Sequence, residues 1–165
     1  MTNLGDDARI LKYRIAVAAC RKGDPLRLAH TVRHLGDAYR QARQDHLAEP
    51  CYVEALETYR QHPNEQPLDL ANALRGFALL KENQGSIEAA QPLWTEAHDL
   101  YASTNVSAGV AESAARLALG ALRRGDVAVS REWLARATSA SEASRDPETM
   151  AYVRQVASTI ASDRS

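Results

Sequence analysis

The stretch LGDAYRQARQDHLAEPCYVEALETY, residues 35–59, decides the fold, because its pattern returns 42 residues later as FALLKENQGSIEAAQPLWTEAHDLY, residues 77–101. The matched positions are Gly36 with Ala78, Ala48 with Ala90, Tyr52 with Trp94, Ala55 with Ala97 and Tyr59 with Tyr101. A weaker third copy, 40 residues further on, has Ala118, Ala121, Ser130, Leu134 and Ala137. Such a repeat is typical of stacked helical hairpins, in which small residues let helices approach closely and aromatic side chains fill the space between hairpins.

Turn signals divide the chain at intervals of 19 to 21 residues, at Gly23, Arg43, Asn64, Gly85, Thr104, Gly125 and Arg145. Between these breaks the apolar residues follow the 3.6-residue period of a helix. Acidic or hydroxyl side chains are predicted to cap helix starts at Asp24, Asp45, Ser86, Asp126 and Asp146. Three glycines are predicted to end helices in the left-handed conformation, at Gly23, Gly85 and Gly125. The pattern predicts an all-α protein of about eight helices, over residues 7–22, 24–42, 45–62, 66–84, 86–103, 106–124, 127–144 and 147–162.

These helices are expected to form a single domain, residues 1–165. It comprises a leading helix (7–22), three repeats (24–62, 66–103 and 106–144) and an amphipathic capping helix (147–162). The formal net charge of −1 argues against a nucleic-acid binder, which usually carries a strongly basic face. The sequence has neither a membrane-length apolar run nor an apolar leader, so we expect a cytoplasmic protein. Its two cysteines, Cys20 and Cys51, are expected to be reduced and to pack as small apolar side chains.

The repeats resemble tetratricopeptide (TPR) repeats, on the motifs Leu35-Gly36-x-x-Tyr39 … Ala48-x-x-x-Tyr52-x-x-Ala55 and Phe77-Ala78 … Ala90-x-x-x-Trp94-x-x-Ala97. The 40–42-residue period is similar to that of the kinesin-light-chain-like subgroup. The resemblance implies a right-handed superhelix of antiparallel helix pairs, a TPR-like α-solenoid. It also implies that the first helix of each pair lines a groove that binds a protein or peptide. Lys81 departs from the pattern, because an aromatic residue is expected there.

The predicted partner-binding groove follows when the packing positions are removed from the first helix of each pair. Its predicted residues are His30, Arg33, Asp37, Arg40, Asn72, Arg75, Leu79, Glu82, Leu119, Leu122 and Arg123. Arg33 and Arg75 share one repeat position, and Leu79 and Leu119 share another. The two arginines are therefore expected to project side by side, and the two leucines are expected to be exposed unless something covers them. A matching partner would carry acidic residues near one end and an apolar anchor near the other.

Chemical sites receive weaker support from the sequence. His30 and His34 have the i, i+4 spacing that can share a metal, but no third ligand follows, so neither a metal nor a cofactor is predicted. No Ser–His–acid or Cys–His arrangement can be nominated, and we expect no catalytic residue and no enzyme activity. The large aromatics, including Trp94, are interpreted as packing residues between hairpins.

The leading helix differs from the others, because apolar residues cover more than half of its circumference. One stripe holds Ile10, Tyr13, Val17 and Cys20, and a second holds Leu11, Ile15 and Ala18. This surplus predicts a homodimer formed through the first helix. The leading functional hypothesis is a non-enzymatic scaffold or adaptor module that binds a protein or peptide. The alternative is the sensor module of a signalling or transcriptional regulator that responds to a peptide or small ligand.

Overall fold

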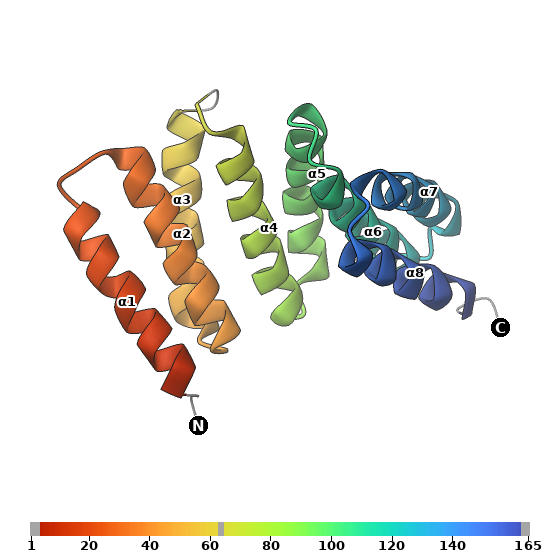
Figure 1. Ribbon diagram of the computed structural model, residues 1–165. Coiled ribbons are helices and arrows are strands. Elements are labelled where there is room, and N and C mark those ends of the chain that lie inside the picture. The colour runs from red at the N-terminus through yellow and green to blue at the C-terminus, as the bar shows by residue number, and fades with distance from the viewer. Residues whose placement is uncertain (1–3, 63–64, 163–165) are drawn as a thin grey trace. The chain divides into compact units, whose positions relative to one another are not determined.

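The computed structural model describes residues 4–62 and 65–162, and over these ranges every regular element is a helix (Figure 1). The eight helices are α1 (Leu4–Cys20), α2 (Pro25–Gln41), α3 (Asp45–Gln61), α4 (Pro67–Asn83), α5 (Ile87–Ser103), α6 (Ser107–Arg123), α7 (Val127–Ser144) and α8 (Pro147–Ser162). The all-α prediction is confirmed, and from α2 onward each predicted boundary lies within one residue of the observed one. The leading helix begins and ends earlier than predicted.

Aspartate caps explain where three helices begin. The Asp24 carboxylate accepts hydrogen bonds from the backbone N–H groups of Leu26 and Arg27, both at 3.2 Å, and Pro25 occupies the first helical position. Equivalent bonds reach Asp126 from Val129 at 3.1 Å and Asp146 from Thr149 at 2.8 Å. The predicted Asp45 cap is wrong, because Asp45 is already the first helical residue and Gln44 precedes it without a capping bond.

Four helix ends share one backbone motif. Residues 43, 85, 105 and 125 have positive φ angles between 57° and 78°, and in each case the next N–H bonds back to the carbonyl five residues earlier. These are the features of a Schellman ending, which satisfies carbonyls that the helix leaves open. Gly85 and Gly125 were correctly predicted. Gly23 was not, since it has no positive φ angle. At the break predicted around Thr104, the left-handed residue is Asn105. The predicted break at Asn64 lies outside the described residues.

The described helices group into two compact units, Met1–Ser86 and Ile87–Ser165. In the first unit, α1 packs along α2, α2 against α3, and α3 against α4, while α4 also contacts α2. The Tyr52 ring is fully buried against two helices, close to Gly36 on one side and Gly76 on the other. Ala55 and Tyr59 are buried on the same helix, as their repeat positions predict.

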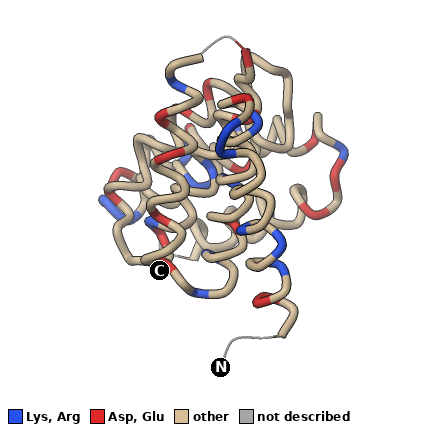
Figure 2. The backbone as a smooth tube through the Cα atoms, turned by 90° about the vertical axis from the view of Figure 1, so that its left-hand side faces the viewer, with Lys and Arg blue, Asp and Glu red and all other residues tan. Residues whose placement is uncertain are grey.

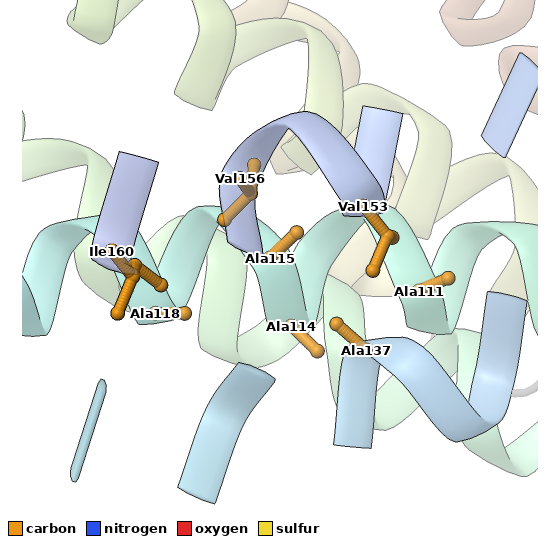
Figure 3. Packing of buried hydrophobic residues seen from close by; sticks show 8 residues of the cluster. All are labelled: Ala111, Ala114, Ala115, Ala118, Ala137, Val153, Val156 and Ile160. Carbon is orange, nitrogen blue, oxygen red and sulfur yellow. The ribbon is translucent and has the colours of Figure 1, made fainter. Parts of the chain in front are cut away.

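In the second unit, α6 packs against α5, α7 and α8. Figure 3 shows Ala137 of α7 and three apolar side chains of α8 gathered along the alanines of α6. Alanine has almost no side-chain bulk, so three helices can approach a fourth closely. Trp94 and Ala97 of α5 are fully buried, which confirms that both are packing residues. Whether the two units form the predicted single domain stays a prediction.

The cysteines and the apolar character of the helices were also considered in the sequence. Cys20 and Cys51 are both free and half-buried, as predicted for small apolar side chains. Among the described helices, none combines the length and the apolar character that crossing a bilayer requires.

Candidate functional site

The strongest candidate site is a cluster of polar side chains in the first unit, which we call the α2–α4 polar cluster. Helix α2 supplies five of its members, α3 one and α4 one. Spacings of three and four residues bring the α2 members onto one face of that helix. Its members are His30, Arg33, His34, Asp37, Arg40, Tyr52 and Asp69.

Asp37 is the centre of this cluster. One carboxylate oxygen accepts a hydrogen bond from the Tyr52 hydroxyl at 2.7 Å, and the other accepts from Arg33 Nη1 at 2.9 Å. Arg40 Nε donates to the same Tyr52 hydroxyl at 3.2 Å, and Arg40 Nη2 lies 3.8 Å from Asp37. Charge-assisted bonds of this kind hold their partners more firmly than neutral ones, so Asp37 fixes two arginines and a tyrosine in place.

Burial sets the electrostatics of the cluster. Arg33 is only 9% exposed, and its charge is matched by the Asp37 carboxylate beside it. Burial, together with the nearby Asp37 charge, raises the pKa of Tyr52 far above its ordinary value. The pKa of Tyr59 is raised for the same main reason, with Asp69 as the second cause. Both phenols are therefore neutral at physiological pH and act as hydrogen-bonding groups rather than as acids.

Two histidines form the outer edge of the cluster. His34 Nε2 lies 2.7 Å from Arg33 Nη2 and 3.2 Å from His30 Nε2, while the Tyr13 ring stacks on His34 with centroids 5.5 Å apart. Burial, followed by the positive charge of Arg33, lowers the pKa of His34 below its ordinary value. A neutral His34 can accept the hydrogen bond from Arg33. His30 reaches across to α4, where its Nδ1 lies 3.4 Å from Asp69.

A metal site is not supported at this edge. Within residues 4–62 and 65–162, no set of three or more histidine, cysteine, aspartate or glutamate side chains is close enough to share a metal ion. The guanidinium of Arg33 also approaches the ring nitrogen that a metal would need. The arrangement offers hydrogen-bond donors and acceptors in fixed positions.

The structure places eight of the predicted groove residues in the first unit. Asn72, Arg75, Leu79 and Glu82 are all half-buried on α4, and three of the four α2 residues belong to the interior of the polar cluster. Arg33 in particular is a buried partner of Asp37 and does not project freely beside Arg75, so that expectation needs correction.

The remaining groove residues lie in the second unit, on α6. Leu119 and Leu122 are partly buried against the cluster formed with α7 and α8, whereas Arg123 is exposed. The prediction that Leu119 is an exposed anchor is therefore wrong. Helix α8 lies along α6 and supplies the apolar contacts that the sequence-based assignment had left for a partner. Because each unit is described by itself, a groove running through both stays a prediction.

Sequence reasoning did not single out Asp69, because acidic residues are common in first helical turns. It also assigned Tyr13, whose ring stacks on His34 beside the cluster, only to an apolar stripe. One signal was available for Asp69. It lies one helical turn before Asn72, the repeat counterpart of His30, so the repeat itself brings residues 30 and 69 to neighbouring positions.

Comparisons with known proteins identify the fold. No family model and no curated protein matches the sequence. Among solved structures, BtubC (BKLC) from P. vanneervenii is similar with a TM-score of 0.78 and 17% identity, over 98% of this chain and 68% of that one. Aspartyl phosphate phosphatase F from Bacillus subtilis is similar with a TM-score of 0.82 and 15% identity, over 92% of this chain and 39% of that one. At these identities the likeness shows the fold alone, a TPR-like array of helical repeats.

Proposed function

We propose that this chain is a non-enzymatic, cytoplasmic module that binds a protein or peptide along the face shared by α2 and α4. The observation that carries the proposal is the α2–α4 polar cluster, in which one carboxylate fixes two arginines and a tyrosine. Burying charged groups costs free energy unless their geometry is excellent, so such a cluster adds little to stability. A surface that is already ordered, however, loses little side-chain entropy when a partner binds.

The chemistry of this face favours a polar partner. The half-exposed rings of His30 and His34 lie at the cluster edge, and Asn72 and Arg75 follow on α4. Acidic and basic residues are interspersed along the helices rather than gathered by sign (Figure 2), which suits a partner of mixed charge better than a polyanion. We infer an extended or helical segment with an acidic residue near Arg75. The 42-residue spacing of Pro25 and Pro67, which open α2 and α4, supports the kinesin-light-chain-like subgroup.

Peptide selection from a display library on the wild-type protein tests this proposal. The affinities of the selected peptides are then measured for Arg75→Glu and for a control, Arg154→Glu, which makes the same charge change at an exposed position of α8. A hydrogen bond between charged groups contributes about 1.5–3 kcal/mol, so Arg75→Glu should weaken binding more than about ten-fold. The control should leave it unchanged. Equal affinities for the two variants, or failure to select any peptide, would refute the proposal.

A sensor module within a larger regulator is the second candidate. It is favoured by the comparison with aspartyl phosphate phosphatase F, in which the matching region is 39% of the longer chain. A sensor must pass the binding signal onward, whereas a scaffold need not. Hydrogen exchange with a selected peptide separates the two candidates, because only a sensor should show altered protection in α7 and α8 when the peptide binds to the first unit.

A further inference from the structure

Helix α1 carries an exposed apolar stripe opposite its buried face. Ile10 and Val17 are 7% exposed and pack on α2, whereas the other side of the helix presents large apolar side chains to solvent. The exposed fractions are 88% for Leu4, 56% for Leu11 and 63% for Ile15. Exposed alanines complete the stripe, which we call the α1 seam: Leu4, Ala8, Leu11, Ile15 and Ala18.

The spacing within the α1 seam is informative. Its members are separated by four, three, four and three residues, which is the heptad repeat of a coiled coil. The alternation places all five side chains in one line along the helix. Among the described residues, seven large apolar side chains are exposed, and three of them lie in the seam while a fourth, Leu47, lines the adjoining cleft. The seam is therefore the main concentration of exposed apolar surface in its unit.

We propose that the α1 seam binds the α1 seam of a second copy of this chain, antiparallel and about a two-fold axis. In this register Leu4 of one copy lies opposite Ile15 of the other, and Ala8 lies opposite Leu11. An alanine then faces a leucine at each central step, so the two helices can approach closely without an empty layer. The surface is self-complementary, as a two-fold interface requires.

Charge selects this register among the antiparallel pairings. Asp7 and Arg14 are seven residues apart on the same flank of the seam, and both also line the cleft between α1 and Leu47. In an antiparallel pair, equivalent flanks meet, so Asp7 of each copy faces Arg14 of the other. A shift by one heptad would instead set Arg14 of one copy against Arg14 of the other, which places like charges together. A parallel pair would instead place Asp7 near Lys12 and leave Arg14 opposite an alanine.

The size of the surface sets the expected strength. The seam extends about 21 Å along the helix at 1.5 Å per residue. One helix pair of this length buries less than the roughly 1,200 Å² of a standard interface, so we expect association in the micromolar range. The proposal is independent of the peptide-binding function, which uses α2 and α4.

Sedimentation velocity between about 5 and 500 μM, a range chosen for micromolar affinity, tests the seam. The wild type should form a dimer. Leu11→Glu should weaken the dimer more than about ten-fold, because it places a charge in the apolar seam. Leu68→Glu is the matched control, since Leu68 is 41% exposed on α4 and should tolerate the same change. Circular dichroism of each variant checks that it is folded.

A charge exchange then tests the register. Arg14→Asp alone and Asp7→Arg alone should each weaken the homodimer, whereas an equimolar mixture of the two should form a heterodimer at least as stable as the wild-type dimer. A monomer throughout the concentration range would overturn the proposal. A dimer whose affinity is unchanged by Leu11→Glu would also overturn it, because the interface would then lie elsewhere. A dimer that is weakened by Leu11→Glu but not by Arg14→Asp would overturn the antiparallel register and indicate a parallel arrangement.

Discussion

Replacing Gly76 by alanine tests the packing on which the polar cluster depends. A Cβ atom at this position would lie 2.6 Å from Tyr52 Cε1 and 3.0 Å from Asp37 Oδ1. Ordinary contact begins near 3.4 Å, so the ring or the helix must move by 0.8 Å (3.4 − 2.6). Gly36 of α2 is close to the same ring, since a Cβ atom built there would lie 3.3 Å from Cε1, so a retreating ring would move towards the α2 backbone.

The expected cost combines three contributions. Overpacking in a tight core costs about 1–3 kcal/mol. Displacing the Tyr52 hydroxyl from the Asp37 carboxylate costs a further 1.5–3 kcal/mol or so, the range for hydrogen bonds to charged groups. Alanine in place of glycine within a helix returns about 1 kcal/mol through its higher helix propensity. We therefore expect Gly76→Ala to lower the free energy of unfolding by roughly 1.5–5 kcal/mol.

Urea denaturation followed by circular dichroism measures this change. Gly23→Ala is the control, because its nearest contact would be an ordinary 3.5 Å and its effect should stay within about 1 kcal/mol. The variant Tyr52→Leu removes the ring that the new methyl group meets. The double variant should therefore be more stable than the sum of the two single effects, by about 0.5–3 kcal/mol. An unchanged stability of Gly76→Ala, or strict additivity with Tyr52→Leu, would refute the packing argument.

Three further outcomes are expected. Gly109→Ala should destabilise by about 1–3 kcal/mol, since its Cβ would overlap the Tyr101 ring, whereas Gly120→Ala should be milder because its closest contact is the flexible end of the Gln91 side chain. Burial lowers the pKa of His34 and of His98, so below their ordinary pKa the unfolded chain binds more protons than the folded one. The melting temperature should therefore fall as the pH is lowered from about 7 to 5, and His98→Gln should make this dependence on pH less steep. Burial raises the pKa of Cys51 to about 11, so its reaction with a disulfide reagent at neutral pH should be much slower in the folded protein than in urea.

The helices could be predicted because their signals are local. A capping aspartate, a proline at the first position and a period of 3.6 act within one turn of the residue concerned, and the repeat supplied the same information twice. Left-handed endings at Arg43 and Asn105 were harder, since neither residue type demands that conformation. There the hydrogen bonds of the Schellman ending fix the backbone, and residue type offers only a weak signal.

The candidate site could be predicted only in part, because its defining contacts join different helices. The pairing of Arg33 with Asp37 follows from their i, i+4 spacing and was available in the sequence. The hydroxyl of Tyr52, by contrast, reaches Asp37 only because α3 packs against α2 at the correct angle. Leu119 illustrates the same limit, since a correctly predicted amphipathic α8 does not reveal which face of α6 it covers.

Tyr52 serves both the packing of the helices and the polar cluster. The repeat positions that hold the hairpins together, Tyr52 among them, also orient the polar groups of the neighbouring face through a single hydroxyl. Tyr52→Phe would leave the buried ring in place but release Asp37 from one of its partners. Asp37 would keep its contacts with the two arginines, and the arginines would be less precisely placed. Packing and recognition are therefore coupled at Tyr52. In the second repeat Trp94 takes its place, and there the Arg116 guanidinium lies over the indole ring, 5.7 Å from its centroid.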